Sequence, residues 1–474
     1  MHVQLCGAMT QTIPSTNLRD NLFLVPLDAD ARWMVYAPLQ KVAFVANARM
    51  VNRIADFVEG NGERDAELSA WLREMGVAEG AAALPQDSFS GPPHPTSVTL
   101  FLTTACNLRC TYCYASTGQQ PVESLDLETA KRGIDVVIGN AIAAGAREIG
   151  VAFHGGGEPS VAWAVLTGSL EHARAAAAER GLGVSASITT NAVLSEPKAR
   201  WIAENLNFAT VSCDGLPEVQ DRNRLTVLGS GSSGQVTRTL KVFDTAGFRY
   251  GLRLTVTPAD VASLPDSVAH LCAAHRPEVI QVEPAHQLGR WEGRPAPEVT
   301  AFIEAFREAR ARAAEYGRRV AFSAARLDVR SRHFCGVSRD TFAVAPGGGV
   351  SACYEVFSRR DEHAGTFFYG SLTADGLRVD VPALDRLREQ TVDARAHCQS
   401  CFAKWHCSGD CYHKVLLAGG AEFTGTDRCH ITRELLKDAL LERIAGSGGL
   451  VWRGEAGACV EAGRAGRAQL AAGD

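Results

Sequence analysis

Cys106, Cys110 and Cys113 stand in the spacing CxxxCxxC, within the stretch CNLRCTYC. Cysteine thiolates at short spacings hold metal ions or iron–sulfur clusters. A structural zinc ion normally takes four protein ligands, and no fourth ligand suggests itself near this stretch. A [4Fe–4S] cluster can take three thiolates and keep one iron open to an external ligand. The spacing alone does not name the metal, but three thiolates without a fourth ligand are compatible with an iron–sulfur cluster that has one open iron, and the motifs that follow favour this over a zinc site.

The other cysteines are also clustered. Of the 14 cysteines, only Cys6, Cys213, Cys272 and Cys459 stand apart, and these we interpret as small buried hydrophobic residues. Besides the three at 106–113, the remaining seven lie in the second half of the chain, at Cys335, Cys353, Cys398, Cys401, Cys407, Cys411 and Cys429. Clustered cysteines in a chain without a secretory signal favour metal binding over disulfides.

Composition limits the possible partners. The chain has 474 residues, 46% of them hydrophobic and 21% charged, with a net charge of −5. This balance gives no sign of a nucleic-acid or membrane partner. The first residues lack the basic start and apolar core of a signal peptide, and no run of 18 apolar residues appears. We expect a cytoplasmic protein.

Hydrophobic patterns divide the chain into five parts. Residues 1–84 combine strand-like stretches with two helical patterns, which predicts a small α+β module of the winged-helix type. Residues 85–96 form a linker rich in Pro, Gly and Ser. In residues 97–330, strands and helices alternate in six βα units. That order predicts a parallel α/β sheet, open or curved into a partial (β/α)6 TIM-like barrel. In residues 331–440 the alternation of strands and helices ends, and cysteines become frequent. Residues 441–474 have the composition of a loose tail.

Polar and glycine-rich motifs fall directly after the predicted strands, where parallel α/β folds place their active sites. The cysteine loop follows the strand at 97–104, and HGGGEP follows the strand at 148–154. TTN ends the strand at 183–190, and SCDGLPEVQDRNR follows the next one.

Together these motifs resemble the radical S-adenosylmethionine (SAM) superfamily. The resemblance implies that the open iron binds the methionine part of SAM, and that an electron from the cluster cleaves SAM to a 5′-deoxyadenosyl radical. It further implies that Glu158 accepts from the ammonium of SAM, and that Arg224 or Arg253 pairs with its carboxylate. The cofactor-binding residues expected on this basis are Tyr112, Gly156, Gly157, Glu158, Pro159, Thr190, Asn191, Ser212, Asp214, Arg224 and Arg253, with Asp221 in the same motif.

The later cysteines resemble a second family element, the SPASM domain, whose seven-cysteine pattern is complete here. The resemblance implies two auxiliary [4Fe–4S] clusters and so three clusters in all. Cys335, Cys353 and Cys411, the first auxiliary group, would hold one cluster with three thiolates only. A fourth ligand would be His333, water or substrate, or the site is open. The second auxiliary group would be Cys398, Cys401, Cys407 and Cys429. A zinc ribbon is the alternative reading of these spacings.

The expected function is that of a maturase of ribosomally made peptides. The 1–84 module would bind a leader peptide by strand addition, and the enzyme would remove two hydrogens from the precursor peptide, most simply to close a crosslink. A reductase, flavodoxin or ferredoxin would supply electrons. Glu355 or Tyr354 is the candidate base, because both follow Cys353 directly. The alternatives are an anaerobic sulfatase-maturating enzyme, weakened by Tyr354 where that family has aspartate, and a non-enzymatic iron–sulfur electron carrier.

Overall fold

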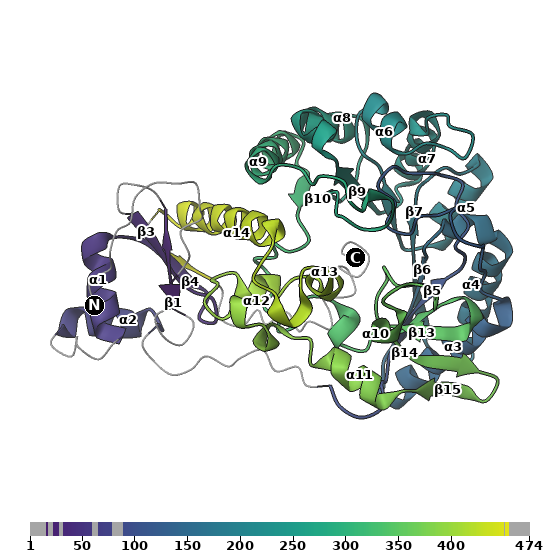
Figure 1. Ribbon diagram of the computed structural model, residues 1–474, viewed down its shortest axis with the longest axis horizontal. Helices are drawn as coiled ribbons and strands as arrows, with labels where there is room; N and C mark the ends of the chain where they lie inside the picture. The colour runs from purple at the N-terminus through teal and green to yellow at the C-terminus, as the bar shows by residue number, and fades with distance from the viewer. Residues whose placement is uncertain are drawn as a thin grey trace.

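The computed structural model of the chain describes residues 16–17, 22–27, 32–58, 65–77, 89–449 and 451–454. An arc of parallel strands covered by helices forms one side of the molecule, and a small antiparallel sheet forms the opposite side (Figure 1). Helices α12 (Lys404–Cys407), α13 (Tyr412–Leu417) and α14 (Asp427–Gly446) lie between them. The cysteine-rich segment therefore connects the two sheets.

The arc is the α/β partial barrel that the sequence predicts. Its strands follow chain order in an 11-stranded sheet, and neighbours from β5 to β11 pair in parallel. The strands are β5 (Ser97–Phe101), β6 (Glu148–His154), β7 (Gly183–Thr190), β8 (Phe208–Ser212), β9 (Tyr250–Val256), β10 (Val279–Pro284) and β11 (Arg319–Ala321). The helices between them are α3 (Leu127–Ala143), α4 (Trp163–Ala178), α5 (Glu196–Asn205), α6 (Pro217–Asn223), α7 (Ser233–Ala246), α8 (Leu264–Ala274) and α9 (Val299–Glu315).

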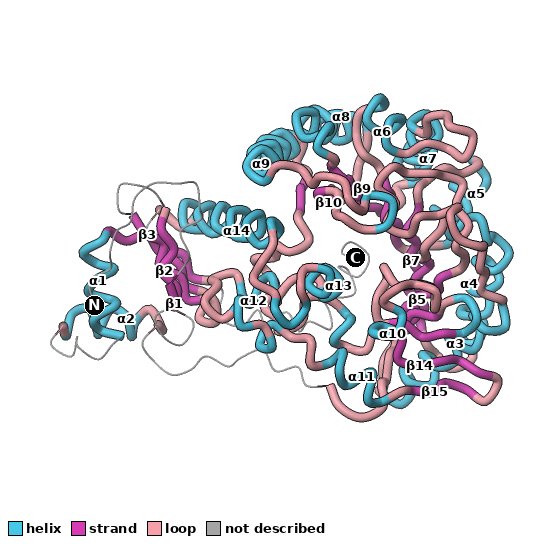
Figure 2. Tube along the Cα trace, in the orientation of Figure 1, coloured by secondary structure: helices cyan, strands magenta, loops and turns pink. Residues whose placement is uncertain are grey.

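Local sequence explains these elements. In β6, residues alternate between buried and partly buried, because successive side chains point to opposite faces of a sheet. Helix α3 begins where the Asp126 carboxylate accepts a hydrogen bond from the Thr129 amide, and α7 ends at Gly247, whose φ of 64° favours glycine. The tube view shows the resulting alternation of strand and helix around the arc (Figure 2).

Four more strands extend the sheet beyond β5. Strand β12 (Ala343–Val344) pairs with β5 in parallel, and β13 (Gly349–Ser351), β14 (Phe368–Thr373) and β15 (Gly376–Val379) continue it antiparallel. Short helices α10 (Ala364–Phe367) and α11 (Val381–Arg388) flank them. This extension brings Tyr354, the residue after Cys353, against Thr99 of the first barrel strand.

The N-terminal module is a sheet with two packed faces. It contains β1 (Thr16–Asn17), β2 (Phe23–Pro26), β3 (Arg32–Ala37) and β4 (Val42–Asn47), followed by α1 (Ala48–Val58) and α2 (Ala66–Glu74). One face packs against α1 and α2, while the other, with Met34 and Tyr36, packs against Phe402, Leu436 and Leu440. The rest of residues 1–84, with Cys6, lies outside the described residues.

The loose tail predicted from residue 441 is wrong for its first part. Helix α14 continues to Gly446, and β16 (Val451–Arg453) pairs antiparallel with β4 at the edge of the N-terminal sheet. Val451 packs against one core of this sheet and Trp452 against the other. A composition rich in Gly and Ala did not reveal these contacts because their partners are distant in sequence. Residues 455–474, with Cys459, lie outside the described residues.

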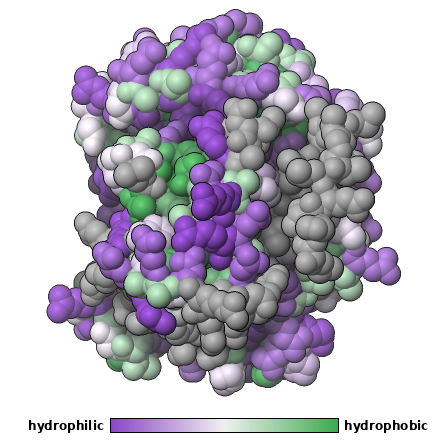
Figure 3. Space-filling model, turned by 90° about the vertical axis from the view of Figure 1, so that its left-hand side faces the viewer, coloured by the Kyte–Doolittle hydropathy of each residue, from purple (hydrophilic) through white to green (hydrophobic). Residues whose placement is uncertain are grey.

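None of the described helices is long and apolar enough to cross a bilayer. On the side that carries the N-terminal sheet, most visible described residues are hydrophilic, and hydrophobic ones gather in one area (Figure 3).

Candidate functional site

The loop after β5 holds the three cysteines of the CxxxCxxC motif. Its backbone is fixed to the segment after α6, because the Arg109 amide donates to the Leu225 carbonyl at 2.6 Å and the Thr111 amide to the Asn223 carbonyl at 2.8 Å. The Leu108 amide and the Asn191 side-chain amide donate to Cys106 Sγ at 3.4 and 3.6 Å. N–H donors on sulfur stabilise a thiolate, so the donor set fits a cluster bound by three cysteines.

Burial changes the acidity of these thiols. It raises the pKa of Cys106 to about 12, with the nearby Glu158 carboxylate adding to the effect, and the pKa of Cys110 to about 11. Without a metal these thiols are therefore protonated at neutral pH. Metal binding has to displace their protons, which couples cluster assembly to the fold.

The GGEP motif packs directly against the cysteine loop. A Cβ on Gly157 would lie 2.1 Å from the Ala105 carbonyl oxygen, so only glycine permits this close approach. Glu158 is 2% exposed, and its carboxylate accepts from Thr190 Oγ1 at 2.8 Å and from the Asn191 amide at 2.7 Å. The motif thus joins the ends of β6 and β7 below the cysteine loop. Contact of Glu158 with an ammonium group remains a prediction.

Arg224 and Arg253 are the candidates for holding a carboxylate. Arg224 is buried, pairs with Asp214 at 3.1 Å and lies over the Tyr112 ring, whose hydroxyl also donates to Asp214. Arg253, on β9, lines the same pocket and forms no ion pair with any described residue. Because the charge of Arg224 is already matched by Asp214, Arg253 is the better placed of the two.

Most of the predicted SAM-binding residues line one pocket at the ends of the barrel strands. Pro159, Asp214 and Asp221 do not line it. Asp221 instead accepts from the Ser233 amide and hydroxyl, next to the start of α7. The predicted residues that do line it are Cys106, Cys110, Tyr112, Cys113, Gly156, Gly157, Glu158, Thr190, Asn191, Ser212, Arg224 and Arg253.

The later cysteines separate into two places. One small cavity beside α12 and α14 is lined by all four thiols of the second auxiliary group, Cys398, Cys401, Cys407 and Cys429. The first auxiliary group, Cys335, Cys353 and Cys411, lines a different cavity of about 540 Å³. This is the grouping that the resemblance implies, although Cys407 and Cys411 are close in sequence.

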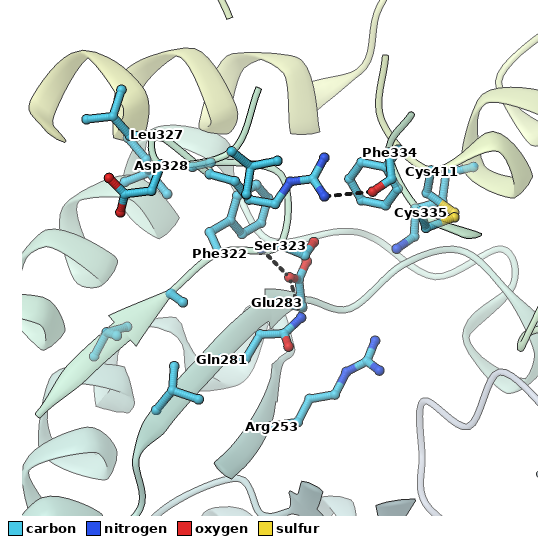
Figure 4. Close-up of a pocket in the computed structure, with 18 of the residues that line it drawn as sticks. Arg253, Gln281, Glu283, Phe322, Ser323, Leu327, Asp328, Phe334, Cys335 and Cys411 are labelled. Carbon is cyan, nitrogen blue, oxygen red and sulfur yellow. Dashed lines mark hydrogen bonds between the residues drawn. The ribbon is translucent and has the colours of Figure 1, made fainter. Parts of the chain in front are cut away.

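The large cavity adjoins the pocket that the predicted SAM-binding residues line. Figure 4 shows Cys335 and Cys411 together on one wall, with Arg253, Gln281 and Glu283 on barrel strands. The residues that line both spaces are Tyr114, His154, Arg253, Glu283, Glu355 and Lys414. A group bound in the pocket therefore faces the same space as the first auxiliary group.

Both candidate bases line the large cavity, and Glu355 also lines the neighbouring pocket. Tyr354 accepts a hydrogen bond from Thr99 Oγ1 at 3.1 Å, and its ring packs against His154. Glu355 accepts from His413 Nδ1 at 2.9 Å. Burial alone would raise the pKa of Glu355, but Lys414 and then His413 hold it well below the usual range. Glu355 is therefore an anionic group between the two cavities.

The sequence interpretation missed several residues of the site. His154, whose pKa burial lowers to about 4, ends β6 directly before the glycine run. Its place at the carboxyl end of a parallel strand was a usable signal. His413 and Lys414 lie two and three positions after Cys411, at the start of the helix that this cysteine precedes. Glu283, near the carboxyl end of β10, offered the same signal as His154, but its ion pair with Arg428 had none because it joins distant parts of the chain.

Comparison with known proteins supports the barrel assignment. Residues 100–261 match the profile of the Radical SAM superfamily. A GTP 3′,8-cyclase from Rhodococcus opacus (strain B4) is 31% identical over 136 residues, 27% of this chain and 36% of that protein. A cysteine-type anaerobic sulfatase-maturating enzyme from Clostridium novyi (strain NT) is 25% identical over 166 residues, 34% of this chain and 44% of that protein. The chain thus matches less than half of each relative's length.

Solved structures are similar to this chain over a larger fraction of its length than these relatives are. Native anSMEcpe with bound AdoMet has a TM-score of 0.58 at 16% identity, covering 74% of this chain and 99% of that one. Streptococcus suis SuiB bound to S-adenosylmethionine has a TM-score of 0.51 at 13% identity, covering 85% and 99%. At such identities the likeness establishes the fold.

Proposed function

Residues 100–261 form a radical SAM domain, and we propose that the chain is a radical SAM enzyme that oxidatively modifies a ribosomally made peptide. The observation that carries this proposal is the wall shared by the SAM-binding pocket and the large cavity. A substrate in a cavity of about 540 Å³ would lie between the site of radical formation and the first auxiliary group. Removal of two hydrogens needs both a hydrogen acceptor and an electron acceptor.

The chain's own residues would bind and orient the reactants. Cys106, Cys110 and Cys113 would hold a [4Fe–4S] cluster which, with SAM bound, supplies the 5′-deoxyadenosyl radical. Arg253 would fix the carboxylate of SAM. In the balanced reaction, one substrate hydrogen enters 5′-deoxyadenosine as an atom, and the other leaves as a proton and an electron. With one electron from an external donor, SAM would yield methionine and 5′-deoxyadenosine, and the electron from the substrate would leave to the groups held by the auxiliary cysteines.

The two auxiliary groups would each hold a further cluster, giving three in all. Their thiols line separate cavities, which suits rigid electron-transfer sites. An external donor, a reductase, flavodoxin or ferredoxin, would start each cycle. The structure of anSMEcpe with the Cp18Cys peptide is a precedent for peptide binding by this fold.

We further propose that the N-terminal sheet binds the leader of the precursor as an added strand. The outer edge of β4 is occupied by β16, a strand of three residues from the chain's own C-terminal part. Strand β4 has six residues, so a longer leader could replace β16 and form more hydrogen bonds.

A second candidate function is sulfatase maturation. Its support is the sequence match to the Clostridium novyi enzyme over 166 residues. The residue after Cys353 is Tyr354 rather than the aspartate expected of that family, which favours the first proposal.

The test is a peptide assay by high-resolution mass spectrometry. The anaerobically reconstituted protein is incubated with SAM, dithionite and the precursor peptide encoded beside its gene. We expect loss of two hydrogens from the peptide, and none with the variant Cys106→Ala/Cys110→Ala/Cys113→Ala. A sulfatase-derived peptide oxidised to formylglycine would support the second candidate. Absence of 5′-deoxyadenosine with any substrate would refute both and favour an electron carrier.

A further inference from the structure

The first auxiliary group offers three thiols, Cys335, Cys353 and Cys411, for a cluster with four irons. We propose that the carboxylate of Glu355 is the fourth ligand, so that every iron is bound by the chain itself. This inference rests on the proposed function, which places a [4Fe–4S] cluster at these cysteines. It assigns Glu355 a role other than that of the base for which its sequence position made it a candidate.

The position of Glu355 among the thiols carries the proposal. Cys353 Sγ, a Glu355 carboxylate oxygen and a His413 ring nitrogen all lie within 4.8 Å of one another. Glu355 also lines the same cavity as all three thiols of the group. The carboxylate therefore lies beside Cys353 and borders the space that Cys335 and Cys411 line.

A short turn after β13 puts Glu355 in this place. The Ser351 hydroxyl contacts the carbonyls of Cys353 and Val356 at 3.0 and 2.7 Å, which fixes the turn between them. Within it Tyr354 reaches away to Thr99 on β5, while Glu355 reaches His413 on α13. The turn thus separates the tyrosine from the carboxylate.

His413 acts as a positioning residue. It is 3% exposed, and its Nδ1 holds Glu355 Oε2 at 2.9 Å. No described residue donates a hydrogen bond to the other oxygen, Oε1. Cys411 directly precedes α13, the helix that carries His413, so one short segment supplies a thiol and orients the carboxylate. A carboxylate ligand is typically held in this way by a neighbouring hydrogen-bond donor.

Two histidines are alternative ligands, and the structure argues against each. His333 Nδ1 bonds Ser338 Oγ at 2.9 Å, and His333 does not line the large cavity. His413 Nε2 is buried without a hydrogen-bond partner, which a metal ligand would explain. However, Glu355 lines the cavity together with the three cysteines, and His413 does not.

Carboxylate ligation has a consequence for the substrate. If Glu355 closes the fourth iron, the peptide cannot bind that iron, and the cluster serves only to transfer electrons. The lone pair of the bound oxygen is then also unavailable for taking a proton from the peptide.

The test measures whether a small external ligand reaches this cluster. All variants are made in the Cys106→Ala/Cys110→Ala/Cys113→Ala background, so that the SAM-binding iron cannot interfere. Each reduced protein is treated with ¹³C-cyanide, and electron–nuclear double resonance detects ¹³C coupling to the clusters. We expect no coupling with Glu355 present and clear coupling in Glu355→Ala. The matched control is Glu362→Ala, an exposed glutamate nearby, which should behave like the parent.

Each other outcome overturns the proposal. Coupling in the parent would mean an open iron. Coupling that appears only in His413→Ala would make His413 the ligand, and coupling in no variant would mean that another group closes the iron. Measuring the iron content distinguishes a failure of this inference from a failure of the proposed function on which it rests. The parent should hold about eight irons per chain, as two [4Fe–4S] clusters require. A lower content there would count against the auxiliary clusters themselves.

Discussion

At the scale of single residues, Arg428 joins three parts of the chain. Its guanidinium contacts Glu283 at the end of β10 at 2.6 Å and Asp410 at 3.0 Å, and all three side chains are buried. Asp410 precedes Cys411, and Arg428 precedes Cys429, so one cation links the barrel to both auxiliary groups. Such a pair is costly to break, because the remaining partners become unpaired buried charges.

We therefore expect Arg428→Met to destabilise the protein by about 3–5 kcal/mol. The matched control is Arg443→Met on the same helix, whose ion pair with Asp328 is largely exposed, and it should cost under about 1 kcal/mol. Denaturant unfolding of both variants measures the difference. Equal losses would show that Arg428 contributes no more than a surface pair.

The ion pair between Glu283 and Arg428 also predicts how the stability of the protein depends on pH. Burial alone would raise the pKa of Glu283, but Arg428 and Lys414 lower it to about 2 from 4.5. Since the pKa is lower in the folded state, this stabilisation is present above about pH 4.5 and disappears as the pH falls toward 2. The stability difference between wild type and Arg428→Met, measured on cluster-free protein, should thus be largest near pH 7 and shrink below pH 4.5. A difference that does not change between pH 7 and pH 3 would exclude Glu283 as its source.

At the scale of elements, β16 closes the β4 edge of the N-terminal sheet. It pairs through Val451, Trp452 and Arg453 only, so it offers few hydrogen bonds. A strand this short contributes little by itself, and most of its stabilisation comes from the apolar contacts of Val451 and Trp452.

Deleting residues 447–474 should therefore open the edge to a leader peptide. If the closed edge is favoured by about 1.4 kcal/mol, its removal should tighten binding about tenfold. Fluorescence anisotropy with a labelled precursor peptide measures this change. Full-length protein carrying Trp452→Gly is a milder variant and should bind with intermediate affinity. Unchanged affinity in both would mean that the leader does not use the β4 edge.

At the scale of the whole molecule, the N-terminal sheet is part of the core. Met34 and Tyr36 on β3 pack against Phe402, Leu436 and Leu440, and the Tyr36 hydroxyl also bonds His406 beside Cys407. The module that the sequence presents as a separate unit thus packs against the segment that carries Cys401 and Cys407 of the second auxiliary group.

A chain lacking residues 1–84 should consequently expose this apolar surface. We expect it to aggregate, or to bind a hydrophobic dye and incorporate fewer irons than the full chain. Size-exclusion chromatography and iron analysis provide the readouts. The variant Glu67→Ala, on the exposed part of α2, should leave both properties unchanged. A monodisperse truncated chain with full iron content would show that the module is an independent appendage.

The sequence by itself determined the order of strands and helices in the barrel and the identity of the cysteines. These follow from local periodicity, since side chains two or about four residues apart share a face of a strand or helix. The same logic placed the CxxxCxxC and glycine-rich motifs at the ends of strands, where the structure has them.

Only the tertiary structure decided which side chains meet. It places Cys407 and Cys411 in different cavities although only three residues lie between them, puts Glu355 beside His413 of a distant segment, and pairs β16 with β4 across most of the chain. Such contacts depend on how whole elements pack, and packing joins residues whose separation in sequence carries no periodic signal.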